Sequence, residues 1–222
     1  MTSLATFIDR HTMRHTRVYP HPVDRVWDAI TDEEQVSKWM GFEVHFPKLE
    51  VGGRCIWGPE DGEYFQTEIS RLEPKTLIEH AGANTHPTGG YIRFELSPHD
   101  DGCRFDFTQH FAPGGTHEEV PDDLGGDLPG GPETPWRPGF VGGFHDAFDG
   151  LGQVLDGKDP ATVPGDPRFR ALVDEWLKRG VRQHEFTGEV ADRYRRQLYG
   201  VSRWNELNEI YRDHIRKTIP SE

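Results

Sequence analysis

The sequence predicts an α+β domain in which a curved antiparallel sheet wraps around a long helix at the end of the domain. Three observations carry this prediction. A strand and two short amphipathic helices come first, six strand-like runs follow between short turns, and a long amphipathic helix comes after them. Turns this short join neighbouring antiparallel strands, so the six runs form a meander. Because one helix cannot fill the concave face of such a sheet, we expect an internal ligand cavity between them.

The first elements lie between residues 12 and 40. Thr12–Tyr19 alternates like a strand, and Pro20-His21-Pro22 ends it. Pro22 suits the start of a helix, and apolar residues then recur at the helical spacing i, i+3, i+4, i+7. These residues are Val23, Val26, Trp27 and Ile30. Asp32-Glu33-Glu34 is typical of the acidic start of a second helix, which we expect to end near Met40.

Strand periodicity dominates residues 42–111. The predicted strands are Phe42–Phe46, Arg54–Trp57, Tyr64–Leu72, Thr76–Ala81, Tyr91–Leu96 and Cys103–Phe111. In the last two strands the alternation predicts which side chains face the interior. The inward set is Ile92, Phe94, Leu96, Phe105, Phe107 and Gln109. The solvated set is Arg93, Glu95, Arg104, Asp106 and His110.

A long loop and one more domain helix follow. Residues 114–138 are dense in Gly, Pro and acid and show no periodicity, which is typical of a long loop. From Pro138 to Leu155 one helical face carries Phe144, Phe148 and further apolar residues, and Asp156-Gly157 ends the helix.

The C-terminal part is predicted to be helical. Residues 160–166 look like a linker, and three helical patterns follow, centred near Trp176, Tyr194 and Tyr211. Each has one apolar stripe that has to dock on something. We therefore divide the chain into a domain at 12–157 and a helical extension at 160–222. We expect the extension to pack on the domain or on a second copy, and we favour a homodimer through these helices.

The charge of the chain limits the classes of binding partner that we expect. The 222 residues include 38 Asp and Glu against 25 Lys and Arg, a formal net charge of −13. Such a surface repels phosphate backbones and anionic lipid, so we expect neither nucleic acid nor membrane insertion. We find no apolar run long enough to span a membrane and no signal-peptide pattern, and we predict a cytoplasmic protein.

The two cysteines, Cys55 and Cys103, lie inside strand-like runs. We therefore expect them to be small buried hydrophobic residues rather than the two halves of a disulfide.

Several ordered blocks carry a resemblance to a known family. The opening block RVYPHPVDRVWDAITDEEQVSKWMG resembles the start of the helix-grip, or SRPBCC, superfamily, which includes START lipid-binding domains, birch-pollen-allergen-like proteins and polyketide cyclases. The later blocks are similar to the family of heat-shock-protein-90 ATPase activator homologues. They are LEVGGRCIWG, EISRLEPKTLIEH, IRFELSPHDDGCRFDFTQHF and GGFHDAFDGLGQVLDG. The resemblance covers about Thr12 to Gly157 and implies a helix-grip fold with an internal cavity. Where the family often places an inward histidine, this chain has Gln109.

Candidate site residues follow from the predicted cavity. Aromatic side chains form its expected walls, and a few polar groups would orient a ligand. The candidate ligand-binding residues are Trp39, Trp57, Tyr64, His80, Phe94, Phe105, Phe107, Gln109, Trp136, Phe144 and Phe148. Glu68 is a further polar candidate. Trp136, just after the long loop, offers one ring to close over a ligand.

The leading prediction of function is binding of a small hydrophobic or aromatic molecule, as a carrier, sequestering protein or sensor. One alternative is a cyclase or dehydratase acting on a polyketide-like substrate, which needs two inward titratable groups. Another is a co-chaperone, as the family name suggests. We expect no cofactor and no metal ion. His11 and His15 have a spacing that can chelate zinc on a helix, but we expect both to be exposed to solvent instead.

Overall fold

The computed structural model describes residues 3–58, 65–81, 90–111, 136, 138–160, 167–182, 187–189, 191–192, 195 and 203–220. Within these residues the predicted order of one strand, two helices, six strands and one long helix is confirmed. A short strand precedes this set and further helices follow it. None of the described helices is long and apolar enough to cross a membrane.

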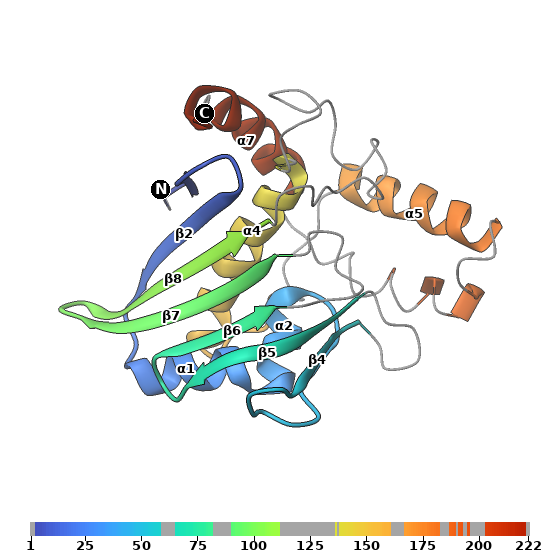
Figure 1. Cartoon of the computed structure of the whole chain (residues 1–222). Coiled ribbons are helices and arrows are strands. Elements are labelled where there is room, and N and C mark those ends of the chain that lie inside the picture. Colours follow the sequence, from blue (N-terminus) through green and yellow to red (C-terminus); the bar gives the residue numbers. More distant parts are fainter. Residues whose placement is uncertain are drawn as a thin grey trace.

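One curved antiparallel sheet of eight strands forms the frame of the molecule (Figure 1). Its order is β1-β2-β8-β7-β6-β5-β4-β3, so the predicted meander is present and β2 closes against its last strand. The strands are β1 (Thr6–Phe7), β2 (Thr12–Tyr19), β3 (Val44–His45), β4 (Arg54–Trp57), β5 (Phe65–Glu73), β6 (Leu77–Ala81), β7 (Tyr91–His99) and β8 (Gly102–His110). The α+β helix-grip arrangement predicted from the sequence is therefore confirmed.

The two faces of the sheet differ as the alternation in β7 and β8 predicts. Phe94 lies opposite Phe107, Ile92 lies opposite Gln109, and all four side chains are buried. The other face carries paired charges. Arg93 Nε donates to Glu79 Oε2 at 2.6 Å, and Arg104 Nε donates to Asp106 Oδ2 at the same distance.

Helices α1 (Val23–Thr31) and α2 (Glu33–Met40) follow β2 directly. The Asp32 carboxylate accepts the backbone N–H of Gln35 at 3.0 Å and caps α2, whose first turn is acidic as predicted. Gly41 ends α2 in the left-handed conformation, with φ of 75°.

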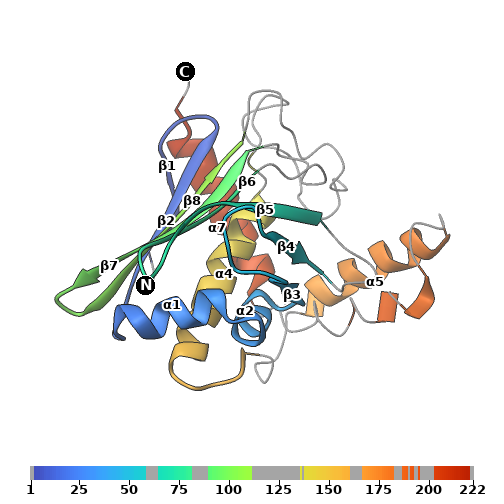
Figure 2. The same ribbon diagram turned by 60° about the horizontal axis from the view of Figure 1, so that its bottom comes forward.

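Helix α4 (Pro138–Leu155) lies on the same side of the sheet as α1 and α2 (Figures 1 and 2). It contacts both of them. Gly150 allows this close approach, because a Cβ at that position would lie 3.3 Å from the Trp39 carbonyl oxygen. The core therefore lies between the sheet on one side and α1, α2 and α4 on the other.

Helix α7 (Trp204–Thr218) packs on α4, and its apolar stripe joins the same core. Leu207, Tyr211 and Ile215 are each at most 1% exposed. This stripe is thus covered by its own chain, while the homodimer stays a prediction. Helix α5 (Pro167–Arg182) stands at the periphery (Figures 1 and 2), with Val173 and Leu177 buried.

Strand β1, the two cysteines and the helix near Tyr194 compare with the sequence predictions in different ways. The pairing of β1 with β2 at Phe7 and Met13 was not predicted. Cys55 and Cys103 are buried free thiols, as predicted. The helix expected near Tyr194 falls largely outside the described residues.

We expect Gly102→Ala to lower the free energy of unfolding strongly. Gly102 has φ of 130°, and a Cβ there would overlap the Tyr19 carbonyl oxygen of the neighbouring strand. Gly157→Ala is the matched control, because Gly157 has a positive φ of 76° but no atom within 4 Å of the added Cβ. Chemical denaturation of both variants checks this. The control should lose about 1 kcal/mol, and an equal loss in both variants would contradict the expected clash.

Candidate functional site

An aromatic cluster forms the centre of the candidate site. We define this aromatic cluster as Trp39, Phe94, Phe105, Phe107, Phe144 and Phe148. Phe107 is its middle, with ring centroids 5.1 Å from Phe94, 4.5 Å from Phe144 and 5.0 Å from Phe148. Trp39 joins the cluster from α2, 6.4 Å from Phe94 and 6.1 Å from Phe148. Six of the predicted site residues are therefore brought together between the sheet and α4.

Two local patterns position these rings. On the sheet, Phe105 and Phe107 are two residues apart on β8, so both project to the same face. On α4, Phe144 and Phe148 are one turn apart and their rings stack at 5.8 Å. Phe144 is half-buried, whereas Phe105, Phe107 and Phe148 are 0% exposed.

A short chain of polar groups lies beside the aromatic cluster. The Trp57 indole Nε1 donates to the Thr67 hydroxyl at 2.9 Å, and that hydroxyl lies 3.5 Å from His80 Nδ1. The His80 ring is 6.1 Å from Phe94 and 5.6 Å from Trp57. Burial away from water lowers the pKa of His80 to about 3, so the imidazole is neutral at pH 7.

The side-chain amide of Gln109 is a buried polar group beside this chain, and it has no hydrogen-bond partner among the described residues. Its side chain is 1% exposed and lies between Met13 on β2 and Ile92 on β7. Within the described residues neither its amide nitrogen nor its amide oxygen has a hydrogen-bond partner. An unpaired buried amide costs free energy, so Gln109 can receive a polar atom from a ligand or a water molecule. Its neighbour His110 faces the opposite side and stacks on Tyr91 at 5.2 Å, in agreement with the predicted parity.

The remaining candidates are placed differently. Trp136 is 0% exposed and contacts Phe7 and Phe111, while its Nε1 donates to the Arg10 carbonyl at 2.9 Å. It thus belongs to the wall at one end of the core. The polar candidate Glu68 is exposed and therefore does not line the interior, whereas the neighbouring Thr67 is buried. Tyr64 lies outside the described residues.

The expectation that His15 is solvent-exposed was also wrong. It lies on β2, whose inward side chains are Met13, His15, Arg17 and Tyr19, and it is 0% exposed. Its ring is 5.4 Å from Phe148 and 6.0 Å from His145. Sequence reasoning considered only the helical spacing of His11 and His15. The strand parity shared by Met13 and Tyr19 would have placed His15 inside.

The residues around His15 form a second group, which sequence reasoning missed. We define the polar cluster as His15, Arg17, His145, Asp149 and Tyr211. The Tyr211 hydroxyl oxygen accepts the Ala5 N–H at 3.0 Å, and the same hydroxyl forms a hydrogen bond of 2.9 Å with His145 Nδ1. Burial, followed by the nearby charges of Arg17 and Arg203, lowers the pKa of His145 to about 4. Burial also raises the pKa of Tyr211 to about 12.

His15 is a buried member of the polar cluster whose ring nitrogens have no hydrogen-bond partner among the described residues. Burial is the main cause that lowers its pKa well below the usual range, and the charge of Arg17 adds to this effect. The backbone of Val141 favours the charged form, but within the described residues neither ring nitrogen has a partner at hydrogen-bond geometry. At neutral pH both His15 and His145 are therefore uncharged, and Arg17 is the buried cation of the polar cluster.

The curved sheet, the helix α4 that it holds and the aromatic interior define a helix-grip domain. Residues 20–128 match the family model "Activator of Hsp90 ATPase homolog 1-like protein", which belongs to the SRPBCC superfamily. The resemblance seen in the sequence is thereby confirmed. No curated protein matches the chain.

Solved structures show the same fold. EF2215 from Enterococcus faecalis, a conserved protein of unknown function, is 13% identical over 80% of this chain and 90% of its own, with a TM-score of 0.53. Ms6760 from Mycobacterium smegmatis is 18% identical over 70% of this chain and 98% of its own, with a TM-score of 0.51. DynU16, a putative protein in the dynemicin biosynthetic locus, is 21% identical over 67% of this chain and 49% of its own, with a TM-score of 0.50.

Proposed function

We propose that this protein binds a small hydrophobic or aromatic molecule between its sheet and helix α4, in contact with the aromatic cluster. The observation that carries the proposal is Gln109, a buried amide two residues after Phe107 on the inward face of β8, whose two polar atoms have no partner among the described residues. Cores without a ligand rarely retain such a group, because each unpaired buried polar atom costs about 1–3 kcal/mol.

The surroundings of Gln109 suit an apolar ligand. Aromatic walls supply a large contact area, and one or two polar groups then fix the orientation of the bound molecule. Phe144 is half-buried while its neighbours in the aromatic cluster are fully buried, so it is the ring with the most freedom to adjust to a ligand.

Binding is favoured over the alternative of a cyclase or dehydratase. A general acid or base works best when its pKa lies near the operating pH. The pKa values of about 3 for His80 and about 4 for His145 leave both imidazoles neutral and weakly basic at pH 7. These groups therefore support orientation of a ligand by hydrogen bonds rather than proton transfer to or from it.

We expect wild-type protein to bind the uncharged fluorescent probe N-phenyl-1-naphthylamine with one-to-one stoichiometry, and Phe107→Asp to abolish this binding. Phe107 is fully buried at the centre of the aromatic cluster, where an unpaired carboxylate costs several kcal/mol or takes up a proton. Fluorescence titration at pH 7 checks the result.

Two controls accompany this titration. Val18→Asp places the same charge on the outer face of β2, where Val18 is 42% exposed, and should leave binding unchanged. If Phe107→Asp fails to fold by circular dichroism, Phe144→Asp replaces it, because Phe144 is half-buried and its change is better tolerated. Unchanged binding in a folded Phe107→Asp protein, or no binding by wild type, contradicts the proposal.

A further inference from the structure

The guanidinium of Arg17 is a buried cation whose charge is incompletely matched. Arg17 is 5% exposed and lies on the inward face of β2, opposite Phe105. Its Nη1 donates to the carbonyl oxygens of Ser3 at 2.8 Å and Thr16 at 3.2 Å. Within the described residues its Nε and Nη2 have no hydrogen-bond partner. One side of the guanidinium is therefore anchored to backbone, and the other side is unsatisfied.

The carboxylate of Asp149 does not fill this gap. Asp149 Oδ1 lies 4.0 Å from Arg17 Nη2, beyond hydrogen-bond distance, whereas Asp149 Oδ2 lies 3.0 Å from Arg203 Nη1. The closer partner of Asp149 is thus Arg203, the N-cap residue of α7. A buried guanidinium left in this state costs several kcal/mol, so the arrangement is favourable when a further anion is present.

The two unsatisfied atoms define the shape of the missing partner. Nε and Nη2 lie on the same edge of the guanidinium and point in nearly parallel directions, so one carboxylate can accept from both in a side-on pair. The surrounding imidazoles do not compete as cations, since His15 and His145 are neutral at pH 7. The unpaired His15 nitrogens lie in the same polar cluster and supply a further hydrogen bond to such a group.

The position of this edge beside the aromatic cluster indicates what the rest of the ligand is. The His15 ring contacts Phe148 at 5.4 Å and Phe107 at 6.3 Å, so it borders both groups. Gln109 lies on the neighbouring strand, diagonal to His15 and on the same face. Arg17, His15 and Gln109 therefore lie on one face of the neighbouring strands β2 and β8, and each carries polar atoms without a hydrogen-bond partner among the described residues.

We infer that the ligand is an apolar carboxylic acid, whose carboxylate pairs side-on with Arg17 Nε and Nη2 while its hydrocarbon or aromatic part contacts the aromatic cluster. This inference rests on the proposed function and narrows its ligand class. It also gives α7 and its N-cap residue a part in the site, because Arg203 pairs more closely with Asp149 than Arg17 does, and Tyr211 hydrogen-bonds His145.

The test compares 2-naphthoic acid with its uncharged counterpart 2-naphthalenemethanol by isothermal titration calorimetry at pH 7. We expect the acid to bind wild-type protein about tenfold or more tightly than the alcohol, as a charge-assisted pair requires. Arg17→Met should remove this preference, because the acid loses its charge-assisted pair whereas the alcohol carries no charge to pair. Arg17→Lys keeps the charge without the side-on pair and should retain only part of the preference.

Arg14→Met is the matched control. Arg14 is on the same strand, but the alternation of side chains along it places Arg14 on the opposite face from Arg17. There its Nε donates to the Thr108 hydroxyl at 3.2 Å. This variant should keep the full preference for the acid. If Arg17→Met does not fold, Arg17→Lys and the wild-type acid-to-alcohol ratio decide the outcome.

Four other outcomes would contradict the inference, and each has a different meaning. Equal binding of acid and alcohol by wild type, or a preference that survives in Arg17→Met, shows that Arg17 has a purely structural role. Displacement of the acid by acetate or phosphate at the same affinity identifies a site for small anions, not for an apolar acid. If N-phenyl-1-naphthylamine binds but the acid has no advantage, this inference fails alone, and if no probe binds, the proposed function fails with it.

Discussion

Deletion of residues 203–222 is expected to leave a chain that aggregates or does not fold cooperatively at 25 °C. The deletion removes three side chains of α7 that are almost completely buried, Leu207, Tyr211 and Ile215. Burial of each such side chain contributes about 1.5–3 kcal/mol, and the sum is comparable to the total stability of an ordinary domain. It also exposes the surface of α4 around Gly142, where a Cβ would lie 3.1 Å from Leu207 Cβ. Size-exclusion chromatography and thermal melting measure the outcome.

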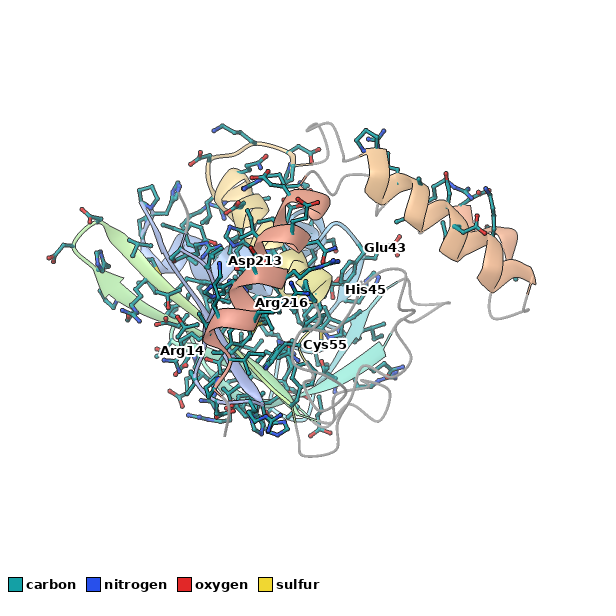
Figure 3. All side chains as sticks on the ribbon, turned by 90° about the horizontal axis from the view of Figure 1, so that it is seen from above. Arg14, Glu43, His45, Cys55, Asp213 and Arg216 are labelled. Atoms are coloured by element: carbon teal, nitrogen blue, oxygen red, sulfur yellow. The ribbon has the colours of Figure 1, made fainter. Side chains whose placement is uncertain are left out.

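Asp213→Ala and Arg216→Ala in the full-length chain are the controls for this deletion. Both side chains are exposed on the outer face of α7 (Figure 3), so their removal should change the melting temperature little. A truncated chain that stays soluble, with the melting temperature and oligomeric state of the full-length protein, would show that α7 is an independent appendage.

Acidification from pH 7 to pH 5 is expected to destabilise the protein progressively. His15, His80 and His145 have folded-state pKa values below the value of about 6.5 that they have when unfolded. Below pH 6.5 the unfolded chain therefore binds more protons than the folded one, and stability falls until the pH reaches the folded-state values of about 4 for His145 and about 3 for His80. Each histidine contributes a slope of up to about 1.4 kcal/mol per pH unit. Carboxylates remain mostly ionised in both states over this range.

The contribution of one histidine can be isolated. His80→Phe replaces a neutral ring that already contacts Phe46, Trp57 and Phe94, and it should flatten the stability profile between pH 7 and pH 5 by up to the slope of one group. His99→Gln changes an exposed histidine at the end of β7 and should leave the profile as in wild type. Urea denaturation at several pH values measures the slopes. Identical slopes in wild type and His80→Phe would mean that the pKa of His80 is the same in the folded and the unfolded chain.

Much of the fold could be predicted because regular alternation and helical spacing report burial directly. In β7 and β8 the alternation is uninterrupted, so Phe94 and Phe107 were placed on the correct face. In β5 the register shifts between Ile69 and Arg71, and such an irregularity changes which residues face inward. A two-residue strand such as Thr6–Phe7 is too short to show any period.

The polar part of the site could not be predicted in the same way. Hydrophobic patterning assigns charged residues to the surface, so it misses an inward guanidinium such as that of Arg17. It also cannot identify the partner of an apolar stripe. The stripe of α7 was visible in the sequence, but its packing on α4 beside His145 depends on contacts between residues far apart in the chain.

The hydrogen bonds at Ala5 have a consequence for the order of folding. Its N–H is held by Tyr211, 206 residues later, and its carbonyl accepts from His214 Nε2 at 2.6 Å. Contacts between such distant positions form slowly, because a very long loop has to close, at a cost in entropy, before the contacts can stabilise the chain. During synthesis, Ala5 therefore lacks its hydrogen-bond partners Tyr211 and His214 until α7 has left the ribosome. We expect the edge of the sheet at β1 to be the last part of the amide network to become protected from hydrogen exchange, at the moment when α7 docks.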